Sequence, residues 1–440
     1  MMISPVAAAQ SKISALTSRH IIICVDGVGF STIEKMRAEG HFKMFKAPSR
    51  MIAPFPTLTN LAMTEILAPA GAGVPEGYED SFYDTKKNRL RGGIVDRLRG
   101  DRFLRGTFRE LFDYHPSAIK SGLGYAAPPV STYLESLSDI IRFGQKARAS
   151  NEDVFFAYTG ATDSLAHLGG EKLVRSFLAR LDATINSIVR DSERPVAVTI
   201  FSDHGNHYRK YKRVGLKAAL RGAGFRLDSS IRDEKSVVFP QFGLIGCAVL
   251  FTKESGEPRV AEALSGVGGV DFAAYETNGV VHIISQSGRA RIERRDEDHF
   301  KYVAEAGDPL NLSDVMRRLA AQGKIDREGY VADADLFEAT RDNERPDAVR
   351  RVFEGVTKGA HNRANVIVNF QDGYYSGSSA LDVFAFLQAA HGNLGREQSL
   401  GFVMSTNSDL PSTLRAGDVW RVIGSPTLNK AMRKDKSAKS

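Results

Sequence analysis

Three apolar runs of the sequence are each followed by side chains that can bind a metal ion. Asp26 follows IIICV, Asp163 and His167 follow FFAYT, and Asp203 and His204 follow VAVTIF. Continuous β-branched and aromatic runs of this length predict strands that are buried on both faces, as in a parallel sheet. Because ligand sites in open α/β sheets lie beyond the carboxyl ends of the strands, we expect these five side chains to meet at one place.

The spacing within these pairs also bears on metal binding. Asp163 and His167 are four residues apart at a predicted helix start, so their side chains lie on one side of it. Asp203 and His204 are adjacent, and only a turn after the strand can aim both inward. Each residue alone also fits a polar turn or a structural histidine. Their repetition after three strands favours a site, and carboxylate with imidazole suits zinc, manganese or iron better than calcium.

A hydroxyl group stands close to a further predicted helix start. Thr59, in FPTLTN, precedes an apolar run with helical spacing. Backbone N–H groups at a helix start favour an anionic oxygen, whether an alkoxide or a phosphate. Thr59 is either a simple helix cap or, if metal ions lie beside it, a nucleophile.

The elements that must position these residues alternate between strands and helices over the first half of the chain, which predicts an α/β fold with a mostly parallel sheet. The predicted strands span residues 20–25, 51–55, 153–158 and 195–201, and the predicted helices span 32–39, 59–68, 131–147 and 171–190. After Leu227 the strands become short and alternate in polarity around one helical stretch at 257–264. This change predicts an inserted, smaller α+β subdomain.

We therefore expect three parts in the chain. Residues 20–227 and 359–427 form the α/β domain that carries the site, since the VIVN run at 366–369 returns to buried-strand character. Residues 228–358 form the inserted cap subdomain. Residues 428–440 are charged and rich in small side chains, which predicts a frayed tail.

Composition excludes several classes of protein. The chain has 440 residues, 42% of them hydrophobic and 25% charged, which is typical of globular proteins and not of disordered, collagen-like or disulfide-rich chains. The net charge of +7 is concentrated, because Lys86–Arg109 holds nine basic and two acidic residues. This basic segment is either a solvated surface or a local electrostatic funnel for a negatively charged substrate.

The sequence also bears on location. Cys24 and Cys247 lie in separate apolar runs and are expected to be buried free thiols. The longest apolar run, Gly243–Phe251, is far shorter than the roughly 18 residues of a membrane span. The N-terminal stretch lacks a basic region followed by a long apolar one, so we expect a cytoplasmic protein without a membrane partner.

Five segments in order, VDGVG, FPTLTN, YTGATDSLAH, FSDHG and AAHGNLGREQS, resemble the motifs of the alkaline phosphatase superfamily. The resemblance spans residues 21–405 and is strongest to the type I phosphodiesterase/nucleotide pyrophosphatase branch. It implies a three-layer α/β sandwich and two divalent metal ions, Zn²⁺ or alternatively Mn²⁺. It implies that Asp163, His167 and His391 hold one ion, and that Asp26, Asp203, His204 and Thr59 hold the other.

The implied chemistry is hydrolysis of a phosphoester through a covalent phospho-threonine at Thr59. Asn60 either donates a hydrogen bond to a phosphoryl oxygen or caps the helix. His361 is an alternative to His391 as the seventh ligand, and His207 either decorates its loop or joins the site. The C/S-x-P-x-R segment of sulfatases is missing from the sequence, so a sulfatase is not expected.

We expect a phosphodiesterase or nucleotide pyrophosphatase that acts on a small phosphate ester. A phosphomonoesterase is the alternative, since basic residues of Lys86–Arg109 or Arg209–Arg213 can bind a dianionic group. A non-catalytic nucleic-acid-binding protein is disfavoured because no helix-turn-helix, zinc-finger or RNA-binding signature occurs. A pseudoenzyme is disfavoured because candidates for all seven ligand positions are present.

Overall fold

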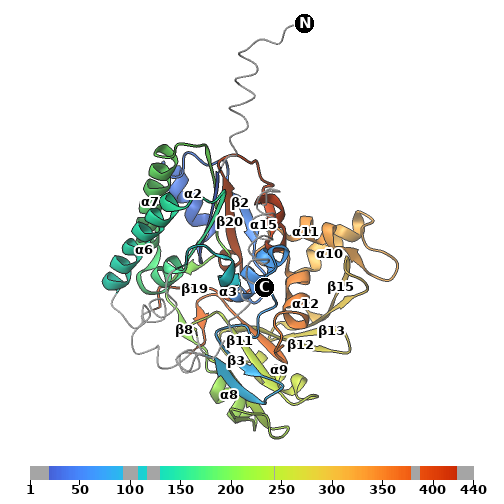
Figure 1. Ribbon diagram of the computed structural model, residues 1–440. Coiled ribbons are helices and arrows are strands. Elements are labelled where there is room, and N and C mark those ends of the chain that lie inside the picture. Colours follow the sequence, from blue (N-terminus) through green and yellow to red (C-terminus); the bar gives the residue numbers. More distant parts are fainter. Residues whose placement is uncertain (1–18, 93–107, 116–128, 242, 378–386, 424–440) are drawn as a thin grey trace.

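The structure of the protein is a computed structural model, and it describes residues 19–92, 108–115, 129–241, 243–377 and 387–423 (Figure 1). These residues form two main sheets and three pairs of short strands. The short pairs are β3 (Ser81–Asp84) with β4 (Arg89–Gly92), β7 (His207–Tyr208) with β19 (Ala389–Ala390), and β8 (Lys212–Arg213) with β18 (Tyr374–Tyr375).

The first sheet has six strands in the order β21-β2-β20-β6-β1-β5. They are β1 (Arg19–Val25), β2 (Ser49–Ile52), β5 (Val154–Thr159), β6 (Val196–Phe201), β20 (Leu400–Ser405) and β21 (Thr413–Arg415). β1 is parallel to β5 and β6, and β2 is parallel to β21. Only β20 runs antiparallel to its two neighbours. The predicted mostly parallel central sheet is therefore confirmed.

Helices cover both faces of this sheet, which makes three layers. Along β1, Ile21 and Ile23 belong to a core with α2 (Phe30–Ala38), α6 (Pro129–Ala149) and α7 (Ala161–Arg190). The alternate residues Ile22 and Cys24 pack with α3 (Thr59–Leu67) and α15 (Ala416–Ile423). Figure 1 shows the two groups of helices on opposite sides of the sheet. A strand that is apolar on both faces needs such a double cover.

The second sheet has nine strands in the order β16-β15-β14-β13-β12-β17-β11-β10-β9. They are β9 (Arg226–Leu227), β10 (Ser236–Val238), β11 (Cys247–Thr252), β12 (Val270–Thr277), β13 (Val280–Ser285), β14 (Gly288–Arg294), β15 (His299–Gly307), β16 (Val331–Ala332) and β17 (Val366–Phe370). The helices between and beside these strands are α8 (Leu216–Gly222), α9 (Glu257–Ser265), α10 (Ser313–Ala321), α11 (Asp333–Thr340) and α12 (Ala348–Thr357). Three short elements complete the described chain: η1 (Ala68–Ala70), η2 (Phe108–Leu111) and α14 (Arg396–Ser399).

The second sheet extends beyond the segment 228–358 that we expected to form the inserted subdomain. β17 lies between β11 and β12 and is antiparallel to both, so it pairs in the second sheet rather than in the first. β9 also joins this sheet. The predicted buried strand at VIVN is present, but an apolar run predicts a buried strand and not the sheet that buries it, so the division of the chain into three parts stays a prediction.

Several other expectations concern the ends and the surface of the chain. Cys24 and Cys247 are free and buried, as predicted. Residues 93–107 of the basic segment and the whole tail 428–440 lie outside the described residues. Among the helices of the described ranges, none combines the length and apolar character needed to cross a bilayer.

Candidate two-metal site

The ends of three neighbouring strands bring the candidate ligands together. β1 pairs with β5 and β6 in parallel, so all three end at the same edge of the first sheet. Asp26 follows β1 directly, Asp163 lies in the first turn of α7 after β5, and Asp203 follows β6. All three carboxylates are at most 7% exposed. The convergence predicted from the strand ends is therefore present.

One group of donor atoms contains Asp26, Asp203 and His204, whose ligand atoms all lie within 4.8 Å of one another. Thr59 is the first residue of α3 and borders this group. Its Oγ1 lies 3.2 Å from Asp26 Oδ1 and 3.2 Å from His204 Nε2. The hydroxyl at the predicted helix start therefore touches two of the predicted ligands.

A second group contains Asp163, His204 and His391, again within 4.8 Å of one another. His167 Nε2 lies 3.3 Å from Asp163 Oδ2, and His391 Nε2 lies 3.7 Å from Asp163 Oδ1. The rings of His204 and His391 are stacked with their centroids 4.0 Å apart. His204 therefore belongs to both groups. Each expected ligand lies close to at least one other expected ligand.

Backbone carbonyl groups orient the three histidines. The Nδ1 atoms of His167, His204 and His391 lie 2.8, 3.0 and 2.8 Å from the carbonyl oxygens of Ala389, Gly205 and Thr57. An N–H at Nδ1 that donates to a carbonyl leaves the Nε2 lone pair free, which is how metal-binding histidines are usually held. Each Nε2 therefore faces the carboxylates.

The electrostatics of the site fit bound cations. Burial and the neighbouring carboxylates of Asp203 and Asp163 raise the pKa of Asp26 well above its ordinary value. Burial also raises the pKa of Asp203 to about 6, and burial together with His204 lowers the pKa of His391 to about 3. The buried Oδ2 of Asp203 has no hydrogen-bond partner. Crowded carboxylates, the imidazoles of His204 and His391, whose pKa values are lowered, and a carboxylate oxygen without a hydrogen bond form a donor set that divalent cations stabilise.

Two residues that support the ligands were not singled out from the sequence. Asn206 is 2% exposed, and its Nδ2 donates to Asp163 Oδ1 at 3.0 Å and to the Gly27 carbonyl oxygen at 2.9 Å. The hydroxyl of Tyr158 donates to Asp26 Oδ2. The motif SDHGN contains Asn206, and Tyr158 is the next-to-last residue of the strand FFAYT, so both lay inside segments already selected.

Gly27 is closely surrounded by the side chains of Asn206 and Asp163. Its φ is +66°, in the left-handed region that favours glycine, and an added Cβ would lie 2.6 Å from Asn206 Nδ2 and 2.7 Å from Asp163 Oδ1. The glycine therefore allows the loop after β1 to meet the loop after β6.

The remaining candidates lie outside the donor groups. His361 is exposed, and its backbone N–H donates to the Pro75 carbonyl oxygen, so His391 and not His361 lies at the site. His207 Nδ1 lies 2.5 Å from Asp372 Oδ2, away from the two donor groups. Asn60 is the second residue of α3 and is half-buried.

The sequence matches no protein-family model and no curated protein. Similar solved structures include phosphonoacetate hydrolase from Sinorhizobium meliloti 1021 with phosphonoformate, with a TM-score of 0.49, 13% identity and 95% of each chain covered. They also include human ectonucleotide pyrophosphatase/phosphodiesterase 5, with a TM-score of 0.49, 12% identity, and 94% of this chain and 95% of that chain covered. The murine protein of the same name gives a TM-score of 0.48 at 10% identity, with 92% and 94% covered.

Proposed function

We propose that the protein is a two-metal hydrolase of small phosphodiesters or nucleotide pyrophosphates, with Thr59 as its nucleophile. The observation that carries this proposal is the position of the Thr59 hydroxyl, 3.2 Å from both Asp26 Oδ1 and His204 Nε2. A free threonine hydroxyl is a poor nucleophile, and it becomes a good one only beside a base or a cation. Its place within a cluster of metal ligands supports this role.

The residues divide between two cations as the sequence motifs imply. Asp26, Asp203, His204 and Thr59 would hold one ion, and Asp163, His167 and His391 would hold the other. Zinc fits the mixture of carboxylate and imidazole, and manganese accepts the same donors. Bound there, the two ions would lower the pKa of the hydroxyl and stabilise charge on the entering and leaving oxygens.

Thr59 then acts in two displacements at phosphorus. In the first, the Thr59 hydroxyl gives up its proton to water, its Oγ1 forms a bond to phosphorus as the bond to the leaving oxygen breaks, and the leaving group gains a proton from water. In the second, water attacks phosphorus and the Thr59 hydroxyl is regenerated. The N–H groups at the start of α3 face the position of the phosphoryl oxygens, and Asn60 donates to one of them.

A phosphomonoesterase remains the alternative, but two of the described basic residues, Arg209 and Arg213, have other partners. Arg209 Nη1 donates to Asp372 Oδ2 at 2.8 Å. Arg213 donates to the Gly377 carbonyl oxygen at 2.7 Å, and its guanidinium lies over the ring of Tyr375. A dianionic monoester needs additional cations, so these contacts favour a diester.

The test is the Thr59→Ala variant assayed on bis-p-nitrophenyl phosphate and p-nitrophenyl phosphate. We expect the wild type to prefer the diester, and we expect Thr59→Ala to lose about 10³-fold or more in kcat while keeping its metal content. Thr59→Ser serves as the matched control, since it keeps a hydroxyl and should keep measurable activity. Wild-type rates in Thr59→Ala would refute the nucleophile, and a large preference for the monoester would refute the substrate class.

A further inference from the structure

Arg351 is a buried cation that contacts two loops of the site from the opposite sheet. It lies in α12, which packs with the second sheet, and it is 5% exposed. Its two Nη atoms donate only to neutral oxygens: Pro346 O at 2.9 Å, Leu394 O at 3.5 Å, Pro54 O at 3.4 Å, Thr57 Oγ1 at 3.2 Å and Ser399 Oγ at 2.8 Å. Within the described part of the chain, no ion pair joins Arg351 to a carboxylate.

Thr57 belongs to the segment that carries Thr59, and Leu394 belongs to the segment that carries His391. Thr57 stands two residues before the proposed nucleophile. Its N–H donates to Gly392 O at 3.1 Å, its Oγ1 donates to Asn393 O at 2.8 Å, and its carbonyl oxygen lies 2.8 Å from His391 Nδ1. Thr57 therefore fixes the loop before α3 and the ring of a proposed metal ligand at the same time.

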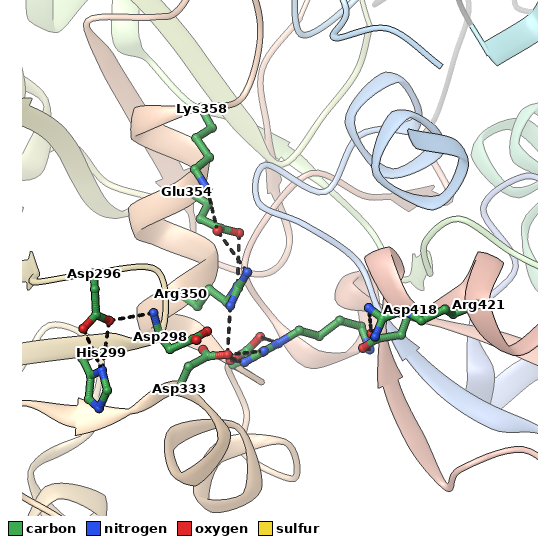
Figure 2. A network of polar contacts seen from close by, with 11 residues as sticks. Asp296, Asp298, His299, Asp333, Arg350, Glu354, Lys358, Asp418 and Arg421 are labelled. Carbon is green, nitrogen blue, oxygen red and sulfur yellow. Dashed lines mark hydrogen bonds and ion pairs between the residues drawn. The ribbon is translucent and has the colours of Figure 1, made fainter. Parts of the chain in front are cut away.

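The approach of α12 to this loop is close. A Cβ added at Gly355 would lie 2.1 Å from the carbonyl oxygen of Phe55, so the helix and the loop are in direct contact. The neighbouring Arg350 of the same helix differs from Arg351, because it forms ion pairs with carboxylates. Its guanidinium pairs with Asp333 at 2.9 Å and with Glu354 at 3.3 Å (Figure 2).

A buried charge that forms no ion pair is unfavourable unless hydrogen bonds compensate it, and the carboxylates of Asp347 and Glu65 act on Arg351 only from beyond ion-pair distance. An apolar side chain would fill the same space without that penalty. Arginine is needed here only if its planar fork of donors is used, since one guanidinium can reach oxygens of both loops at once. A lysine ammonium is a single point and cannot span them.

We propose that Arg351 is a positioning residue, which holds Thr57 so that the hydroxyl of Thr59 and the ring of His391 keep their mutual geometry. The role rests on the proposed function. Arg351 touches neither reacting atoms nor ligands; it acts through Thr57 and Ser399. Because a displacement of about 1 Å can reduce the rate about 100-fold, loss of this support should act mainly on the chemical step.

The test compares Arg351→Met with Arg351→Lys. We expect Arg351→Met to lower kcat about 10- to 100-fold, with KM changed by less than about threefold, and Arg351→Lys to recover only part of the loss. A readout that does not depend on turnover is the absorption spectrum of the Co²⁺-loaded protein, which reports the ligands around the ion. It should change in Arg351→Met because Thr57, whose carbonyl oxygen holds the His391 ring, loses its support.

Arg350→Met is the matched control, because it removes the same charge one residue away and leaves Thr57 untouched. It should lower the melting temperature while keeping kcat and the Co²⁺ spectrum. If Arg351→Met does not fold, Thr57→Val tests the same link, since it removes the hydroxyl that Arg351 contacts and keeps the backbone. It should reproduce the kcat loss and the spectral change.

Wild-type kcat and an unchanged Co²⁺ spectrum in Thr57→Val or in folded Arg351→Met would overturn the role of Arg351. An equal loss of kcat in Arg350→Met would also overturn it, because the effect would then be one of stability. Failure of the proposed function gives a different result. In that case Thr59→Ala itself remains active, whatever the Arg351 variants do.

Discussion

Asp203 is the residue at which the need for a cation is most evident. One of its carboxylate oxygens accepts from Gly27 N at 3.1 Å, and the other is buried without a hydrogen-bond partner. Burial removes the solvation of this charged atom without a hydrogen bond in return, and the nearby His204 Nε2 lies 3.5 Å from it. A bound ion would compensate this loss, which makes Asp203 a sensitive position for metal binding.

We expect Asp203→Asn to lose at least one metal ion and to reduce activity by about 100-fold or more, because the amide is a far weaker ligand than a carboxylate. Elemental analysis of the purified variant measures this directly. Asp372→Asn is the control, since this carboxylate pairs with His207 and Arg209 outside the donor groups. A full metal complement in Asp203→Asn would remove Asp203 from the ligand set.

Much of the candidate site was predictable because its residues follow recognisable strands. Asp26, Asp163 and Asp203 each stand just past a continuous apolar run, and parallel pairing alone brings such positions together. Arg351 had no such signal. It lies in an ordinary amphipathic helix, and its contact with Thr57 joins residues 294 positions apart. Only the tertiary structure defines a contact of this kind.

At the scale of elements, α3 lies between the two sheets and contributes to a core on each side. Leu61 packs with the second sheet, whereas Met63 and Ile66 pack with the first. Glu65 lies between them, and its Oε1 accepts from Gly417 N of α15 at 3.1 Å. Burial and the nearby Glu354 raise the pKa of Glu65 to about 7.

This raised pKa predicts a pH-dependent stability. The folded state binds the proton of Glu65 more tightly than the unfolded state, so the stability contributed by this group is present below its unfolded pKa of 4.5 and is lost as the pH rises through about 7. Glu65→Gln should therefore be more stable than the wild type at pH 8, by up to about 2–3 kcal/mol, and close to it at pH 5.

Urea unfolding of both proteins at the two pH values measures the difference. Glu338→Gln, at an exposed position of α11, is the control and should show the same small effect at both. If Glu65→Gln gained as much at pH 5 as at pH 8, ionisation of Glu65 would not be the cause.

The elements themselves were predicted unevenly. Strands β1, β5 and β6 were found from their composition, because burial on both faces leaves a continuous apolar run. β17 was found as a strand, but its sequence did not predict which sheet it joins. Its run Val366–Phe370 is buried throughout, like the runs of the first sheet, and its partners β11 and β12 lie about 100 residues earlier in the chain. Composition defines burial, whereas pairing depends on the whole topology.

At the scale of the whole molecule, Arg415 links the first sheet to the helices of the second. It ends β21 at the edge of the first sheet and donates to Asp347 Oδ2 at 2.7 Å and to Asp333 Oδ1 at 2.9 Å. Asp347 is 2% exposed and precedes α12, and Asp333 begins α11. Arg350, Glu354 and Lys358 extend this network along α12 (Figure 2).

We expect Arg415→Met to lower the free energy of unfolding by about 3–5 kcal/mol, since it leaves the buried Asp347 without its charged partner. Urea unfolding measures the loss. The double variant Arg415→Met/Asp347→Asn should recover part of it, because the uncompensated charge is then removed. A single variant within about 0.5 kcal/mol of the wild type would show that the network contributes little.

The strand order of the first sheet has a consequence for when the protein becomes competent during its synthesis. β2 precedes Thr59 by a few residues, yet its only partners in the sheet are β20 and β21 near the other end of the described chain. Sheet pairing between such distant segments forms late, since the loop between them must close first. The segment before the nucleophile therefore has no sheet position until residues 400–415 have left the ribosome. The proposed hydrolysis should therefore begin only after residues 400–415 have been synthesised and have paired with β2.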